Sequence, residues 1–109
     1  MSKYVYVITV MERFNKEIDC KGNLLNVYVG SKRTVAVCNS YEEAARIIED
    51  NIDDIWERSY DFACIEQIKL NEVYPFIITQ DLFKYDGVLD KYYMISRKDY
   101  PTYSLCEIG

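Results

Sequence analysis

The run Lys3–Met11, "KYVYVITVM", is apolar on both alternating faces. Its even-numbered residues from Tyr4 to Val10 would line one face, and its odd-numbered residues from Val5 to Met11 the other. A strand of this kind lies inside a sheet that has both faces covered. The run is much shorter than the ~20 residues of a membrane-spanning helix. It also lacks the small-residue cleavage site of a secretion signal, so we interpret it as an interior strand.

The clearest helical pattern is Asn39–Ser59, "NSYEEAARIIEDNIDDIWERS". Ser40 followed by Glu43 fits a capping box, in which Ser40 caps the free backbone amides and Glu43 reaches back to the Ser40 amide. Apolar residues then recur at helical spacing as one stripe: Tyr41, Ala44, Ala45, Ile48, Ile52, Ile55 and Trp56. The pattern predicts one amphipathic helix that ends near Arg58, where a cation suits the helix dipole.

Strand patterns lie on both sides of this helix. Leu24–Val29 and Thr34–Cys38 are β-rich and separated by "GSKR", which predicts a hairpin between them. The preceding charged stretch, Glu12–Asn23, predicts a loop. Phe62–Leu70 predicts another strand, and the "FIIT" that follows Pro75 predicts a short one.

The chain ends in a β-rich region. "LFKYDGVLDKYYMI" has the form of a second hairpin, with Asp86-Gly87 as its turn. The tail "SRKDYPTYSLCEIG" has little periodicity. The order of elements predicts a single α+β domain over residues 1–109, with one main helix packed on an antiparallel or mixed sheet.

The chain has four cysteines and no histidine. The cysteines lack metal-ligand spacing, so we expect no structural zinc and reduced thiols in a cytosolic protein. Cys38 and Cys64 fall in apolar runs and are expected in the core. The commonest general base is missing, and the adjacent acids Asp53 and Asp54 would diverge by about 100° on a helix. We therefore expect no catalytic residue, no cofactor and no enzyme.

The net charge of −5 is concentrated in one segment. Residues 40–59 contain two bases, Arg46 and Arg58, and seven acids: Glu42, Glu43, Glu49, Asp50, Asp53, Asp54 and Glu57. The whole chain has 18 acids and 13 bases, so the remainder holds eleven of each. Glu49 and Asp53 would share a helix face, where like charges repel. One explanation is a solvated face, and the other is a surface that meets a basic partner.

Other functional signals are weaker. The only basic clusters are the pairs Lys32-Arg33 and Arg97-Lys98, so direct nucleic-acid binding is not expected. "GSKRT" lacks the spacing of a phosphate loop, and we interpret Lys32 and Arg33 as a solvated turn.

Two alternative functions stay open. In an oligomeric nucleotide sponge or sensor, Lys32, Arg33, Arg97 or Lys98 would hold phosphates and a tyrosine would stack on the base. In a homo-oligomer or structural subunit, the Tyr-rich end would form the interface. Its tyrosines are Tyr85, Tyr92, Tyr93, Tyr100 and Tyr103.

The segments "YVYVITV", "VAVCNSYEEAARII" and "DFACIEQIKL" resemble those of small uncharacterised proteins of phages and mobile elements. Such proteins begin with a strand, then have a strand that runs into S-x-E-x-A and a helix, then another strand. The resemblance covers roughly residues 3–70. It implies a fold but brings no active site, so no functional residue is carried over from it.

These observations together predict a small acidic cytosolic binding protein that does not enter a membrane. Its most concrete form is a phage-type inhibitor of a host defence system, such as an anti-CRISPR protein. The seven acids of residues 40–59 would cover a basic nucleic-acid-binding surface of a host protein and mimic phosphate charge.

Overall fold

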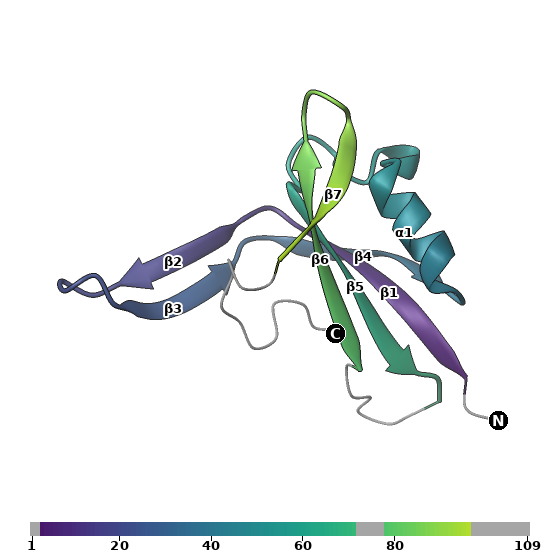
Figure 1. Cartoon of the computed structure of the whole chain (residues 1–109), viewed down its shortest axis with the longest axis horizontal. Helices are drawn as coiled ribbons and strands as arrows, with labels where there is room; N and C mark the ends of the chain where they lie inside the picture. The colour runs from purple at the N-terminus through teal and green to yellow at the C-terminus, as the bar shows by residue number, and fades with distance from the viewer. Residues whose placement is uncertain (1–2, 72–77, 97–109) are drawn as a thin grey trace.

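The computed structural model describes residues 3–71 and 78–96. Five antiparallel strands form one sheet in the order β4-β1-β5-β6-β7, and the helix α1 (Tyr41–Glu49) packs on one of its faces (Figure 1). This confirms the predicted α+β class. The core between helix and sheet includes the fully buried residues Ile8, Ile48 and Phe83.

Strand β1 (Tyr4–Met11) lies inside the sheet, as its two apolar faces predict. It pairs with β4 (Lys32–Cys38) on one side and with β5 (Phe62–Lys69) on the other. Its residues from Val7 to Met11 are all buried, so both faces of the strand are covered. Burial of apolar surface contributes roughly 25 cal/mol per Å², which makes this strand a main source of stability.

The region between β1 and β4 differs from its prediction. The supposed loop at Glu12–Asn23 contains strand β2 (Phe14–Ile18), which pairs with β3 (Leu24–Val29) in a two-stranded sheet. The predicted hairpin between Leu24–Val29 and Thr34–Cys38 is wrong. Strand β3 continues into β4 in the same direction, and β1 continues into β2 in the same way, so the four strands form one long hairpin. Two backbone hydrogen bonds keep the ladder continuous at this junction: Glu12 N donates to Ser31 O at 2.9 Å, and Gly30 N donates to Arg13 O at 2.8 Å.

The real turn of this long hairpin lies at residues 19–23, far from "GSKR" (Figure 1). The Asp19 carboxylate accepts hydrogen bonds from Lys21 N at 2.9 Å and from Asn23 N at 2.8 Å. The Asn23 bond is the main cause of a lowered Asp19 pKa. Gly22 has φ +85°, which costs glycine little. Lys32 and Arg33 consequently belong to a strand and not to a turn.

Helix α1 starts where its sequence predicts and ends early. Ser40 Oγ accepts a hydrogen bond from Glu43 N at 3.2 Å, whereas the Glu43 carboxylate contacts Arg46 Nη2 at 2.8 Å. The predicted helix to Arg58 is wrong, since α1 ends at Glu49 and is followed by a 3₁₀ turn, η1 (Ile52–Asp54). Asn51 has φ +48°, a left-handed conformation that ends the helix and that Asn tolerates better than most residues.

Replacing the cap residue tests the start of this helix. Ser40→Ala is expected to lower the free energy of unfolding by about 1 kcal/mol, because Glu43 N loses its acceptor. Ser40→Asn keeps a capping oxygen and is expected to stay near wild type. Denaturant titration of the three proteins measures the difference. Equal stabilities would show that the cap contributes nothing.

The second half of the sheet follows its predictions. Strand β5 pairs with β6 (Thr79–Asp86), and β6 forms a hairpin with β7 (Lys91–Ile95) through a turn at residues 87–90. Cys38 and Cys64 are buried as expected. The first two residues of the predicted "FIIT" strand lie outside the described residues, and its last residue, Thr79, begins β6. Most of the tail, including Cys106, also lies outside them.

Candidate functional site

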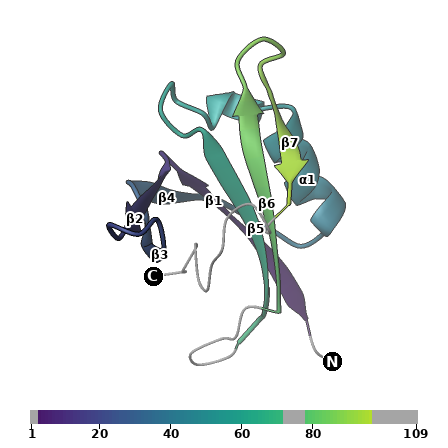
Figure 2. The same ribbon diagram turned by 60° about the vertical axis from the view of Figure 1, so that its left-hand side comes forward.

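The segment that follows α1, residues 50–61, runs beside the turn between β6 and β7 (Figure 2). Five of its residues have φ between +47° and +63°: Asn51, Asp53, Asp54, Glu57 and Arg58. Such angles carry strain in residues other than glycine and persist only where surrounding contacts impose them. In this segment, the contacts that impose these backbone angles come from one asparagine and a group of aromatic rings.

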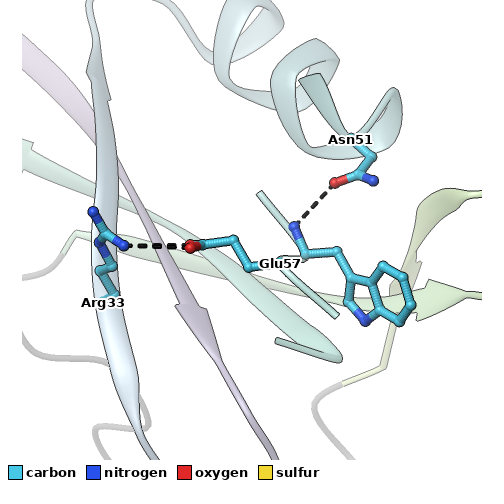
Figure 3. A network of polar contacts seen from close by, with 4 residues as sticks. Arg33, Asn51 and Glu57 are labelled. Carbon is cyan, nitrogen blue, oxygen red and sulfur yellow. Dashed lines mark hydrogen bonds and ion pairs between the residues drawn. The ribbon is translucent and has the colours of Figure 1, made fainter. Parts of the chain in front are cut away.

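Asn51 is 8% exposed and joins three parts of the chain. Its Oδ1 accepts a hydrogen bond from Trp56 N at 3.0 Å (Figure 3). Its Nδ2 donates to Asp90 Oδ1 at 3.0 Å, across to the β6–β7 turn. The Tyr85 hydroxyl donates to the same Asp90 oxygen. The left-handed residue that ends the helix therefore also fastens the following segment to the hairpin.

An aromatic cluster completes this connection. The Trp56 ring stacks on the Tyr85 ring with centroids 4.2 Å apart and planes at 12°. Tyr85 meets Tyr92 edge to face at 5.2 Å, and the Tyr92 hydroxyl donates to the Tyr60 carbonyl. Trp56 Nε1 donates to Asp61 Oδ1 at 2.9 Å. Aromatic pairs in these geometries each add about 0.5–1.5 kcal/mol beyond their buried area.

These contacts gather carboxylates at one end of the sheet, which we call the acidic end. It consists of Asp50, Asp53, Asp54, Glu57, Asp61, Asp86 and Asp90. All except the half-buried Asp86 are exposed. The first four belong to the predicted set of acids. Asp61 was missed because it lies just beyond the predicted helix, and Asp86 and Asp90 because they come from the β6–β7 hairpin. A clue was present in Asp86 and Asp90, which flank the predicted turn of the second hairpin.

The other predicted acids lie elsewhere. Glu42 and Glu43 are in the first turn of α1, about 10 Å or more along the helix from Asp50. Glu49 is the last residue of α1. Because the helix ends there, the predicted helical face shared by Glu49 and Asp53 does not exist. The seven acids are all exposed, but the structure divides them between two ends of the helix.

Glu43 borders a separate hollow at the start of the helix. The hollow has a volume of about 510 Å³ and is lined by residues of β1, β4 and α1, among them Val37 and Ile47. Burial raises the pKa of the neighbouring Cys38 thiol, and the Glu43 charge raises it further. A thiol with a raised pKa is a poor nucleophile at neutral pH, so this hollow has no activated cysteine.

A groove of about 420 Å³ runs between the acidic end and β4. It is lined by Asp53, Asp54, Ile55 and Glu57 from the segment after α1, and by Arg33, Thr34 and Val35 from β4. Arg33 Nη1 lies 3.4 Å from Glu57 Oε2 (Figure 3). At the other side of the acidic end, Lys91 Nζ lies 3.9 Å from Asp50 Oδ1. Exposed pairs of this kind contribute little, typically below 1 kcal/mol.

The carboxylates also act on the tyrosine hydroxyls. The hydrogen bond to Asp90 raises the pKa of Tyr85 to about 12, and burial and nearby acids add to the effect. Burial raises the pKa of Tyr41 to about 12, with a hydrogen bond to Asp81 as the next cause. Burial and the Asp61 charge raise the pKa of Tyr92 as well. The folded chain thus keeps these phenols neutral beyond the usual pKa of about 10.

Alkaline titration is expected to reveal these shifts. Below pH 10 the tyrosines are neutral in the folded and unfolded chains, so their contribution to stability is complete. Between about pH 10 and 12 the unfolded chain loses phenol protons that the folded chain keeps, and the free energy of unfolding falls. Phenolate absorbance and denaturant titration across this range measure both effects. In Tyr85→Phe the decline should be smaller; an identical decline would contradict the assignment to Tyr85.

The described residues hold no group of three or more Cys, Asp or Glu side chains arranged to bind a metal ion. No helix in the described ranges 3–71 and 78–96 has the length and apolar character needed to cross a membrane. Comparisons with family models, curated proteins and solved structures give no significant match.

Proposed function

We propose that this protein is a small binding protein whose acidic end covers a basic, nucleic-acid-binding surface of a protein partner. The observation that carries the proposal is the collection of seven carboxylates from the 50–61 segment and the β6–β7 hairpin. The same two parts of the structure carry three cations, Arg58, Lys84 and Lys91, and Arg33 of the neighbouring strand β4 pairs with Glu57. Such a surface attracts a basic partner at long range and repels nucleic acid.

The way the acids are held supports the same function. Like charges repel, so gathering them at one end works against folding. The hydrogen bonds of Asn51 and the stack of Trp56 on Tyr85 hold them there nevertheless. A surface that is fixed before binding loses less conformational entropy on association than a mobile one. The arrangement therefore suits a rigid mimic of phosphate charge better than a merely solvated face.

The biological role proposed here is anti-defence. The resemblance to small phage proteins and the acidic end both fit an inhibitor, of the anti-CRISPR type, that acts in the cytosol of a bacterial host. Defence proteins that handle nucleic acid carry grooves rich in Lys and Arg, because phosphate contacts supply much of their affinity. An acidic inhibitor would occupy such a groove.

The alternative nucleotide sponge has less support. Arg33 is paired with Glu57 beside a groove that also contains Asp53 and Asp54, and these charges repel phosphate. Arg97 and Lys98 lie outside the described residues. Assembly through the Tyr-rich end also has less support, since Tyr85 and Tyr92 are engaged within the chain. Tyr93 is 47% exposed, and Tyr100 and Tyr103 lie outside the described residues.

Affinity capture tests the proposal. The immobilised protein is incubated with bacterial lysate, washed at low or high salt, and the retained proteins are identified by mass spectrometry. We expect a basic nucleic-acid-handling protein in stoichiometric amount that is lost at high salt, because screening weakens exposed charge pairs. Lysate treated with nuclease excludes bridging by nucleic acid. Absence of any protein partner in both washes would contradict the proposal.

A further inference from the structure

The turn between β6 and β7 presents two bare aliphatic side chains. Val88 is 93% exposed and Leu89 is 66% exposed. Val88 is more exposed than the other large hydrophobic side chains on the surface of the five-stranded sheet and its turns, such as Tyr93 at 47% and Met94 at 55%. Turns of hairpins usually carry polar residues and glycine. Two adjacent aliphatic residues at such a tip contribute nothing to the core of this chain.

This tip is held in a fixed shape at both ends. At its start, Asp86 Oδ1 accepts hydrogen bonds from Val88 N at 2.9 Å and from Leu89 N at 3.3 Å. At its end, Asp90 has φ +55° and accepts hydrogen bonds from Asn51 Nδ2 and from the Tyr85 hydroxyl. The aliphatic side chains are therefore displayed on a rigid support, which reduces the entropy that docking would cost.

The surroundings of the tip define what it can dock on. Asp86 and Asp90 flank it, and Asp50 lies beside it through the contact with Lys91. Cell membranes carry negative surface charge and would repel these acids. A protein pocket that is apolar inside and bordered by Lys or Arg complements both features. Interfaces commonly combine an apolar anchor with a polar rim in this way.

We infer that Val88 and Leu89 form a hydrophobic anchor that inserts into an apolar pocket bordered by Lys and Arg on a protein partner. The inference rests on the proposed function, since it uses the same acidic end. It adds a division of roles: the carboxylates set the rate and salt dependence of association, whereas the aliphatic tip slows dissociation.

The test uses the protein that is identified by low-salt capture. This protein is purified and titrated by calorimetry at two salt concentrations at which wild type still binds. Val88→Ser/Leu89→Ser is expected to weaken binding at least about tenfold at both salt concentrations without changing the salt dependence. The matched control is Ile18→Ser/Val37→Ser. It makes the same chemical change at side chains that are 56% and 63% exposed and lie away from the turn. Circular dichroism verifies that each variant is folded.

The outcomes separate the two proposals. The acidic surface is tested beside it with Asp53→Asn/Asp54→Asn. If the tip variant binds like wild type while this asparagine variant binds weakly, the anchor is refuted and the acidic surface stands. If the tip variant binds weakly while the asparagine variant binds like wild type, the anchor stands and the charge-mimic function falls. If the control loses as much affinity as the tip variant, the anchor is refuted. Failure to capture any protein refutes both.

Photo-crosslinking tests directly whether the tip contacts the partner. Photo-leucine at position 89 should crosslink to the captured protein within a peptide that contains apolar residues beside Lys or Arg. Photo-leucine at position 18, on β2, should give no crosslink. Crosslinks from position 18 and none from position 89 would refute the anchor whatever the affinities show.

Discussion

Replacing Asp53 and Asp54 with lysine is expected to abolish binding to the captured partner, and replacing both with asparagine to weaken it at least about tenfold, or ~1.4 kcal/mol. Both side chains are exposed, and both line the groove beside β4. Among the described residues neither forms an ion pair, in contrast to Asp50 with Lys91 and Glu57 with Arg33. Asp54 Oδ1 accepts a long hydrogen bond from Asn51 Nδ2 at 3.5 Å, and an asparagine at position 54 keeps an acceptor for it. Binding at low and high salt measures the loss and the change in salt dependence.

The asparagine variant distinguishes a loss of binding caused by the lost charge from one caused by backbone strain at these two positions. Asp53 and Asp54 have φ +56° and +55°, and Asn adopts such angles as readily as Asp, whereas Lys adds strain. The matched control is Glu42→Gln/Glu43→Gln, which removes two carboxylates in the first turn of α1, outside the acidic end, and is expected to bind nearly as wild type. Equal losses in the two neutralised variants would show that net charge matters and the acidic end does not.

Asn51→Ala is expected to lower the free energy of unfolding by about 2–5 kcal/mol. The change leaves the half-buried Trp56 N without its acceptor, at a cost of roughly 1–3 kcal/mol, whereas the exposed Asp90 can replace its lost donor with water. It also places alanine at φ +48°, at a cost of about 1–2 kcal/mol. Since domains are stable by only about 5–15 kcal/mol, denaturant titration will detect the loss easily.

Comparison with Asn51→Gly separates the two causes. Glycine tolerates the left-handed conformation, so it removes the hydrogen bonds without the strain. We expect Asn51→Gly to recover about 1 kcal/mol relative to Asn51→Ala and still to be clearly less stable than wild type. Binding by the glycine variant should also fall, because the 50–61 segment is no longer fastened to Asp90. Wild-type stability in Asn51→Gly would mean that the network does not hold the acidic end.

The fold could be predicted where the signal was local. The apolar faces of Tyr4–Met11 identified an interior strand, and Ser40 identified the start of the helix. The helix end was missed because Ile52, Ile55 and Trp56 happen to continue its spacing while the backbone has already left it. Asn51 was the relevant signal, but Asn is compatible with helix interiors too, and its contacts with Trp56 and Asp90 decide its conformation.

The long hairpin was missed for a related reason. Glu12–Asn23 is polar, and polar composition does not distinguish a loop from an exposed strand whose pairing is supplied by another segment. "GSKR" looked like a turn, whereas the Asp19 and Gly22 pair contained the true one. The choice depends on which segments pair with which, and the sequence does not encode that locally.

The sequence predicted four of the seven acids that form the acidic end. Asp50, Asp53, Asp54 and Glu57 could be found from charge concentrated in one segment. Asp86 and Asp90 could not, because the packing of Trp56 against Tyr85 and the bond from Asn51 to Asp90 bring the hairpin to this segment. Asp61 was left out because it follows the predicted end of the helix. Glu42, Glu43 and Glu49 were included on the assumption of one long helix, and its early end removes the face they would have shared with the others.

Competition for the partner between this protein and nucleic acid shows whether the acidic end occupies the nucleic-acid site. A labelled oligonucleotide is bound to the captured protein, and its fluorescence anisotropy is followed as this protein is added. We expect wild type to displace the oligonucleotide stoichiometrically and Asp53→Lys/Asp54→Lys to displace none of it. A ternary complex, in which the oligonucleotide stays bound while this protein binds as well, would contradict the claim that the acidic end occupies the nucleic-acid site.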